Sequence, residues 1–317
     1  MKSLDVEVYF IFAAIAFVIT LIGTVLNSLV LVTFVKTPNL LNCPNIIICS
    51  MCVADLLASS TAAPLLFYAN LTQSWPFGIA GCKMYAFLTT LCGLTSIIHL
   101  AGAAFERYDS FDRAPRGYGL LNEKRTVFLV VLLWIYALIF SVAPLLGWSD
   151  YTFENHGTSC AVNWSSSSVA VISHTAVVFL TFFLLPVGIM LFSHYRVWKI
   201  VRQIRFNANN IWGNRSAAAM KSSCTQKKMS ILIAIMTCVF LTAWTPYALV
   251  ALISVCGYGH LIPALGSAVP AYVAKLSFTV NPIIYAFLFK SFRKKMFRQL
   301  LGCRLSRNSQ GPYPQGV

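Results

Sequence analysis

One lysine stands alone in a long apolar stretch near the carboxyl end of the chain. Lys275 is the only residue with a fixed charge between residues 261 and 289. At a rise of about 1.5 Å per residue, it would lie roughly 20 Å along a helix that crosses about 30 Å of hydrocarbon. A lysine at that depth costs about 2.5–3.5 kcal/mol, so we expect a function for it, with a purely structural lysine as the alternative. A desolvated amine is an effective nucleophile.

A carboxylate also falls inside an apolar segment. Asp55 lies in the run NIIICSMCVADLL, residues 45–57. A charge at that depth must pair with polar neighbours or with an ion. Asn27 and Asn281 stand at matching depths in other apolar segments, and we expect them to share Asp55. The cluster is either a sodium or water site or a polar contact that holds helices together.

Seven apolar segments are long enough to cross a membrane and must position these residues. Hydrophobic residues make up 58% of the chain and charged residues 10%, whereas a soluble domain carries about 25% charged residues. Only helices and closed barrels satisfy the backbone in lipid, and the alternation typical of barrel strands is absent. The sequence therefore predicts an all-α membrane protein with a seven-transmembrane helix bundle. The seven segments are 8–35, 45–68, 84–105, 126–148, 168–193, 229–256 and 261–289.

The net charge of +15 is distributed unevenly along the chain. With the amino terminus outside, all lysines and arginines except Lys2, Lys83 and Lys275 fall on the cytoplasmic side. The positive-inside rule then predicts an extracellular amino terminus and a cytoplasmic carboxyl terminus. We expect an integral membrane protein in the plasma membrane. The basic surface would face anionic lipid or a cytoplasmic partner, so nucleic acid is not needed to explain it.

Four regions follow from this topology. Residues 1–7 are expected to form a short extracellular amino terminus, and residues 8–289 the seven-helix transmembrane domain. Residues 290–302 form an amphipathic basic stretch that is predicted to lie on the inner membrane face as a short eighth helix. Residues 303–317 would form a short cytoplasmic tail, in which Cys303 is a candidate for palmitoylation.

Two of the ten cysteines differ from the others in their position. Cys82 stands at the outer start of the third segment, and Cys160 lies in the outer loop after the fourth. Both face the oxidising side of the membrane, which favours a disulfide that tethers the loop over the bundle. Two free thiols are the alternative.

Residues near the inner ends of the segments suggest a bundle that can open. Glu106 and Arg107, followed by Tyr108, can pair in a closed bundle and part in an open one, although arginine is also common at membrane boundaries. Prolines interrupt the fifth, sixth and seventh segments, and kinked helices around a polar core can act as hinges. These prolines are Pro186, Pro246 and Pro282.

Together these residues resemble the rhodopsin-like G-protein-coupled receptors over nearly the whole chain. The resemblance implies a receptor and not an enzyme. It also implies roles in activation and G-protein coupling for Glu106, Arg107, Tyr108, Asn281, Pro282 and Tyr285. The matching landmarks, in order, are Asn27, VADLL with Asp55, Trp75, Cys82 with Cys160, ERY at 106–108, Trp134, Pro186, WTPY at 244–247 and NPIIY at 281–285.

Lys275 stands six residues before Asn281, at the position where opsins carry their retinal-binding lysine. The resemblance therefore implies a Schiff base between Lys275 and 11-cis or all-trans retinal. Opsins place its negative counterion either three residues after the third-helix cysteine or six residues before the loop cysteine. The first position is Tyr85, which is neutral, and the second is Glu154. Glu154 is thus implied as the counterion with Tyr85 as its hydrogen-bonding partner, as in non-visual and invertebrate opsins; a solvated loop acid is the alternative.

A cavity with aromatic walls and one charged anchor would suit a polyene aldehyde. The resemblance implies that it is lined by Tyr85, Thr90, Gly93, Phe182, Trp244, Tyr247 and Lys275. Two positions depart from the family pattern. His194 replaces a tyrosine of the fifth helix, and Gln226 replaces an acidic residue that often pairs with the arginine of ERY.

Three functions remain open at this point. The leading hypothesis is a light-activated receptor that engages a heterotrimeric G protein, with arrestin as a further candidate partner. The second is a retinal photoisomerase that resembles the retinochrome group and supplies 11-cis retinal. The third is a receptor for a diffusible ligand, against which Lys275 argues.

Overall fold

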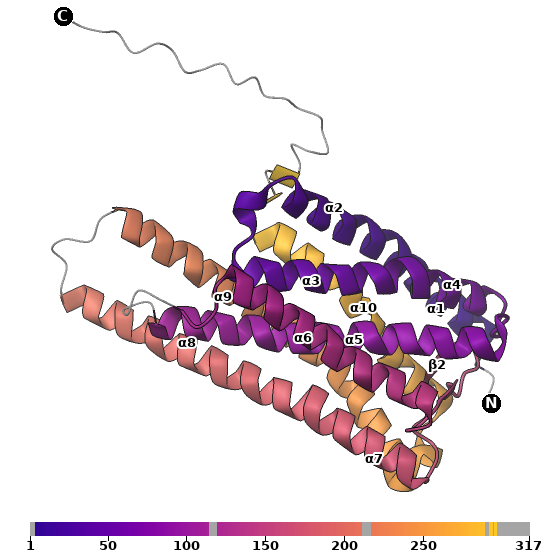
Figure 1. Cartoon of the computed structure of the whole chain (residues 1–317). Helices are drawn as coiled ribbons and strands as arrows, with labels where there is room; N and C mark the ends of the chain where they lie inside the picture. The colour runs from indigo at the N-terminus through magenta and orange to yellow at the C-terminus, as the bar shows by residue number, and fades with distance from the viewer. Residues whose placement is uncertain (1–3, 114–118, 211–216, 289–291, 294, 297–317) are drawn as a thin grey trace, which may run out of the picture.

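The structure is a computed structural model of the chain. It describes residues 4–113, 119–210, 217–288, 292–293 and 295–296, with the side chains of 204–226 and 286–288 left out. Within these ranges long helices run roughly side by side, and one short β-hairpin closes an end of the bundle (Figure 1).

The first four predicted segments each form one helical rod. The first two rods contain a short π-helical turn, and the fourth ends in a 3-10 turn. The first rod is α1 (Val6–Val18), a turn at Ile19–Gly23 and α2 (Thr24–Val35). The second is α3 (Cys43–Leu57), a turn at Ala58–Ala62 and α4 (Ala63–Leu71). The third is α5 (Gly78–Arg113), and the fourth is α6 (Glu123–Val142) with Ala143–Leu146.

The last three segments also form one rod each. Two of these rods extend well beyond the predicted apolar segments, towards the end of the bundle opposite the hairpin (Figure 1). The fifth rod is α7 (Val169–Val178), a π-helical turn at Phe179–Leu184 and α8 (Leu185–Asn210). The sixth is α9 (Ala217–Ile253), followed by turns at Ser254–Tyr258 and Gly259–Leu261, and the seventh is α10 (Ala264–Leu288).

Local sequence explains where several rods begin and widen. The side chains of Asn42, Asn122 and Ser168 each accept a hydrogen bond from a backbone N–H three residues later, which caps α3, α6 and α7. Pro64 and Pro186 each follow a π-helical turn. A proline has no N–H to donate and its ring clashes with the carbonyl four residues earlier, so the preceding turn widens.

Length and composition place the rods in a membrane. Among the described residues, six rods are long and apolar enough to span, with mean hydropathy between 1.6 and 2.6. The seventh, α10, has 25 residues, which also exceeds the roughly 20 residues that a span requires. The protein is therefore an integral membrane protein, and its fold class is the predicted one.

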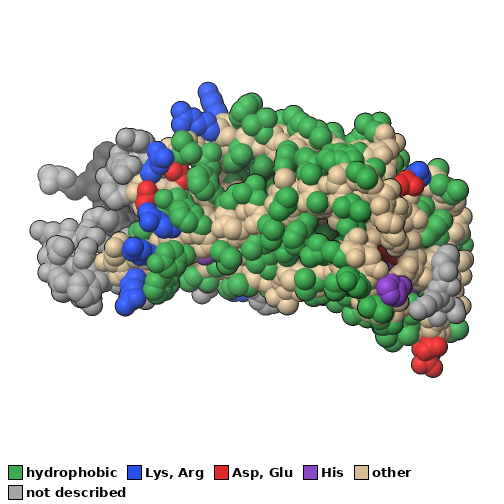
Figure 2. Space-filling view, turned by 90° about the horizontal axis from the view of Figure 1, so that it is seen from below, with side chains coloured by type: hydrophobic (Ala, Val, Ile, Leu, Met, Phe, Trp, Pro, Cys, Tyr) green, Lys and Arg blue, Asp and Glu red, His purple; other side chains and the backbone are tan. Residues whose placement is uncertain are grey.

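The surface has the distribution of side chains that a membrane requires. Apolar side chains cover the middle of the face shown in Figure 2, and lysines and arginines gather at one end of it. Phe10, Phe128 and Leu191 are among the large apolar residues that remain exposed, as expected where hydrocarbon is the solvent. The interior is apolar as well, and α5 lies at its centre, in contact with α3, α6, α8, α9 and the hairpin.

Only part of the predicted eighth helix falls within the described residues. Residues 292–293 and 295–296 are helical, and the Phe292 ring packs 5.3 Å from Phe34 and 4.5 Å from Tyr285 between ring centroids. The remainder of 290–302, Cys303 and the tail lie outside the described residues, as does the side chain of Gln226.

Candidate ligand-binding site

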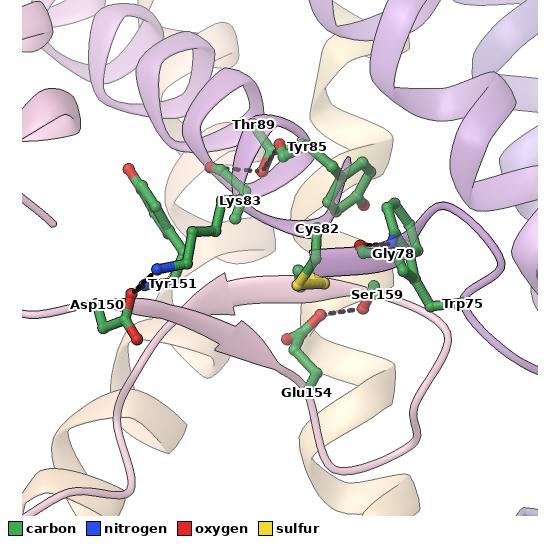
Figure 3. The surroundings of a disulfide bond; sticks show 12 residues. Trp75, Gly78, Cys82, Lys83, Tyr85, Thr89, Asp150, Tyr151, Glu154 and Ser159 are labelled. Atoms are coloured by element: carbon green, nitrogen blue, oxygen red, sulfur yellow. Dashed lines mark hydrogen bonds and ion pairs between the residues drawn. A yellow bond between two sulfur atoms is a disulfide. The ribbon is translucent and has the colours of Figure 1, made fainter. Parts of the chain in front are cut away.

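A disulfide fastens the hairpin to the helix bundle. The hairpin consists of β1 (Tyr151–Phe153) and β2 (Cys160–Val162), paired antiparallel with Phe153 opposite Cys160. Cys160 is bonded to Cys82 in the first turns of α5 (Figure 3). The predicted disulfide is thus confirmed, and it fixes the loop between the strands over one end of the bundle.

Lys275 on α10 faces a carboxylate of this loop. Its Nζ atom lies 3.6 Å from Oε2 of Glu154, which directly follows β1. The two side chains retain only 13% and 12% of their exposure to solvent. The Lys275 ammonium also lies 5.6 Å from the ring centroid of Tyr272, one helical turn earlier on α10. An ion pair so poorly hydrated interacts more strongly than one at the surface.

Neighbouring groups keep Glu154 charged. Burial alone would raise the pKa of its carboxyl group. The charges of Lys275 and His156, together with hydrogen bonds from Ser159 and Lys275, outweigh burial and hold the pKa of Glu154 below its usual range. Glu154 is therefore a carboxylate near neutral pH, which is the state required of a negative partner for a cation.

The hydrogen-bonding partner of Glu154 differs from the one that was predicted. The Ser159 hydroxyl donates to the Glu154 carboxylate, as the dashed line in Figure 3 marks. The Tyr85 hydroxyl is buried and has no hydrogen-bond partner in the described part of the chain. Its ring instead lies edge-on against Trp75, at 5.1 Å between centroids. Tyr85 therefore packs against Trp75, and the hydrogen-bond donor to Glu154 comes from the loop itself, from Ser159.

Lys275 also reaches an apolar cavity lined by residues of α5, β2, α7, the π-helical turn at Phe179–Leu184, α9 and α10. Of the seven residues predicted to line it, six do so, and Tyr85 is the exception. The predicted residues that line the cavity are Thr90, Gly93, Phe182, Trp244, Tyr247 and Lys275. Further aromatic lining comes from Phe179, Phe183, Phe240, Phe278 and Trp164, which sequence reasoning missed. Helical spacing from Phe182 and Trp244 was the available signal for Phe179 and Phe240.

The shape of the cavity depends on a close approach between α5 and α9. A Cβ atom added to Gly93 would lie 2.5 Å from Cη2 of Trp244. The indole Nε1 of Trp244 donates to the Ser277 hydroxyl at 2.9 Å, and the Phe240 ring stacks on the indole at 5.4 Å. Trp244 is therefore contacted by α5, by α10 and by Phe240 of its own helix, and it stands two residues before Pro246.

The polar cluster around Asp55 differs in one member from the predicted set. Asn281 donates to the Asp55 carboxylate at 3.0 Å, and Ser96 donates at 3.2 Å. Asn27 does not reach it, because its amide donates to the backbone oxygens of Gly23 and Phe278. Asp55 thus joins α3 to α5 and α10, whereas Asn27 joins the first rod to α10.

At the opposite end of the bundle, Glu106 and Arg107 form a closed pair. The Arg107 guanidinium donates through Nε and Nη2 to the two carboxylate oxygens of Glu106, both at 2.6 Å. The Ser110 hydroxyl donates to the same carboxylate at 2.8 Å, and all three groups lie within α5. Tyr108 lies outside this pair and faces the Arg196 guanidinium at 5.5 Å.

Two further landmarks connect helices near this end. The hydroxyl of Tyr285 donates to Asn45 Oδ1 at 3.1 Å, which joins α10 to α3. His194, at the position where the family usually carries tyrosine, lies 3.1 Å from the Thr237 hydroxyl through Nε2, which joins α8 to α9.

Residues 26–285 match the family model of the 7 transmembrane receptor (rhodopsin family). The chain belongs to this family. Its members are receptors and not enzymes, so the chain is assigned as an integral membrane receptor.

Melanopsins are among the proteins similar to this receptor. Human melanopsin is 32% identical over 308 residues, which cover 93% of this chain. Melanopsin-B of Gadus morhua is 32% identical over 297 residues, which cover 92% of this chain. The chain spans 63% and 48% of the length of these two relatives. The opsin-type resemblance predicted from the sequence is confirmed by them.

A solved structure supports the fold. The crystal structure of squid rhodopsin matches the receptor with a TM-score of 0.88, over 100% of this chain and 95% of that one, at 22% sequence identity. At this identity the match concerns the fold, and it confirms the predicted seven-helix bundle.

Proposed function

We propose that this receptor is a light sensor that binds retinal covalently, as a Schiff base on Lys275. The observation that carries the proposal is the position of the Lys275 amine, which reaches the aromatic cavity and lies 3.6 Å from Glu154. Retinal supplies light absorption and a change of shape on illumination. The residues of the chain bind it, orient it and control the charge at its point of attachment.

The cavity fits an elongated apolar aldehyde. Aromatic side chains form most of its walls, and the amine of Lys275 is the one charged group that lines it among the described residues. Apolar walls with a few well-placed polar groups are typical of sites for small apolar ligands. Trp244 and Gly93 narrow the space between α5 and α9, so the ligand would contact the kinked helix directly.

Glu154 supports the proposal as the counterion. A protonated Schiff base is a buried cation and needs a negative partner nearby. Glu154 is ionised and is held by the Ser159 hydroxyl in a loop that the disulfide anchors. Both retinal isomers carry the same aldehyde, so the Schiff base of either one would need this negative partner.

We further propose that the receptor activates a heterotrimeric G protein. The closed pair of Glu106 and Arg107 lies in the last turns of α5, which ends at Arg113, and the next helix begins with Lys124 and Arg125. By the positive-inside rule this end faces the cytoplasm and the amino terminus lies outside. We propose the plasma membrane as the location of the protein. Arrestin is a further proposed partner. The similarity to melanopsins supports a receptor over a photoisomerase.

Absorption spectra of the reconstituted protein test the proposed ligand, and a nucleotide-exchange assay tests the proposed signalling. The purified protein mixed separately with 11-cis and all-trans retinal should develop a visible or near-ultraviolet band distinct from that of free retinal. Illumination of this sample should then increase nucleotide exchange on at least one G protein. A protein that forms no such band with either isomer would contradict the proposed ligand.

A further inference from the structure

A buried histidine lies next to the carboxylate that faces Lys275. His156 belongs to the loop between β1 and β2 and is only 2% exposed. Its Nε2 atom lies 3.0 Å from the Ser159 hydroxyl oxygen, and that hydroxyl donates to Glu154. Lys275, Glu154, Ser159 and His156 therefore form one continuous chain of polar contacts.

Hydrogen-bond accounting gives the tautomer of the neutral imidazole. A serine hydroxyl has one proton, and the ionised Glu154 can only accept, so the Ser159 proton points to Glu154. His156 must then donate its Nε2–H to the Ser159 oxygen, and in the neutral ring this leaves Nδ1 without a proton. This Nδ1 atom is buried and has no hydrogen-bond partner within the described residues. It is a vacant position for one proton.

Groups from α1, from α10 and from its own loop surround His156. From α1, the Tyr9 hydroxyl donates to the His156 carbonyl oxygen at 3.0 Å. From α10, the Tyr272 ring lies 6.0 Å from the imidazole between centroids, and its hydroxyl is hydrogen-bonded to Asn70. The charges that face His156 are the Glu154 carboxylate and the Lys275 ammonium. Among these described groups, Glu154 is the one that favours a positive imidazole.

The environment keeps the imidazole neutral under ordinary conditions. Burial lowers the pKa of His156, the Glu154 carboxylate raises it, and the Lys275 ammonium lowers it, with a net shift below the usual value. The Nδ1 atom of His156 is therefore unprotonated near neutral pH. The Nδ1 atom can take up a proton on acidification.

We propose that His156 takes up the first proton to reach this site on acidification and so keeps Glu154 ionised beside Lys275. One N–H bond forms at Nδ1 as an O–H bond of hydronium breaks, and water is released. The new positive charge stabilises the carboxylate through the Ser159 bridge, so the two residues titrate as a coupled pair. The importance of this charge for a pigment rests on the proposed function.

The test uses the protein without retinal, so a failure of the proposed ligand would not affect it. Infrared spectroscopy follows the carbonyl stretch of protonated Glu154 as the pH is lowered, with Glu154→Gln to assign the band. His156→Gln keeps an N–H donor near the Nε2 position but cannot take up a proton, and His156→Leu removes both properties. His260→Gln serves as a matched control, because His260 is exposed and contacts only a backbone oxygen among the described contacts.

The proposal predicts that Glu154 becomes protonated at a pH about 1 unit higher in His156→Gln than in the native protein. His156→Leu should show at least the same shift, and His260→Gln should titrate like the native protein. Circular dichroism and monodisperse elution establish that each variant is folded. A native midpoint in folded His156→Gln would overturn the proposal, whatever the behaviour of His156→Leu.

Discussion

The amine of Lys275 lies 3.6 Å from the carboxylate of Glu154, although one belongs to a membrane helix and the other to a loop that a disulfide holds over the bundle. The pair joins the residue proposed to bind retinal to a group that can balance its charge. A change in either residue, or in the loop that carries Glu154, should therefore alter the pigment.

The first prediction concerns the charge of Glu154. An opposite charge within about 4–6 Å favours the charged form of a titrating group by about 1–3 pH units. The native Schiff base should thus stay protonated as the pH rises past neutrality, and Glu154→Gln should lose its proton at a pH at least about 1 unit lower. The absorbance of Glu154→Gln at neutral pH should move towards the ultraviolet, as a pH titration of the spectrum would measure.

Tyr85→Phe is the matched control for that titration. The Tyr85 hydroxyl makes no hydrogen bond among the described residues, so its removal should change the midpoint much less. An unchanged midpoint in Glu154→Gln would exclude Glu154 as the counterion.

The second prediction concerns signalling. Arg107→Ala breaks the pair with Glu106 and removes the guanidinium from the end of the bundle proposed to bind the G protein. Light-driven nucleotide exchange should fall about tenfold or more, equivalent to at least about 1.4 kcal/mol, while the absorption band is retained. Lys83→Ala, in an exposed ion pair with Asp150 beside the hairpin, should leave exchange near the native rate.

A negative result in this assay distinguishes the two retinal-based hypotheses. If G proteins of all four major classes remain silent while illumination releases 11-cis retinal, the protein is a photoisomerase and the proposed signalling function is wrong.

The third prediction concerns the disulfide. Cys82→Ser releases the hairpin from α5, so Glu154 should no longer be held beside Lys275. Removal of a native disulfide typically costs about 2–5 kcal/mol, so thermal unfolding should begin at a markedly lower temperature, and the yield of pigment should fall. Cys238→Ser is the control, because Cys238 is a free, exposed cysteine of α9. Equal effects of the two substitutions would argue against a specific role for the tether.

The fourth prediction concerns the narrow part of the cavity. The methyl group of Gly93→Ala would lie 2.5 Å from Cη2 of Trp244, so the indole must move or the helices must separate. Overpacking of this kind costs about 1–3 kcal/mol, and retinal binding should weaken or the absorption maximum should shift. Gly188→Ala, at a position with open space around the added atom, should bind retinal normally. Native binding and spectrum in Gly93→Ala would remove Trp244 from the binding site.

Properties that depend on local sequence were predicted well. Hydropathy located all seven rods, because each needs only a long apolar run. The disulfide was predicted from two cysteines expected on the same, oxidising side of the membrane, and the structure contains it. Glu106 and Arg107 are adjacent in sequence, so their pairing required no knowledge of helix packing.

Contacts that depend on the rotation of helices and the path of loops were not predicted. Tyr85 and Ser159 both stand near the disulfide in sequence, and spacing does not indicate which hydroxyl reaches Glu154. Asn27 matches Asp55 in depth but lies on the side of its helix that faces α10. His156 is in a loop, where residues are usually exposed, and it is buried because α1 and α10 pack around it.

The covalent attachment site is the most direct test of the proposed function. The protein reconstituted with retinal is reduced with borohydride, digested and mapped by mass spectrometry, next to a Lys275→Ala sample treated identically. The expected result is a retinyl adduct on Lys275 in the native protein and neither adduct nor absorption band in the variant. A normal pigment in Lys275→Ala, or an adduct on another lysine, would contradict the assignment of Lys275 as the retinal-binding residue.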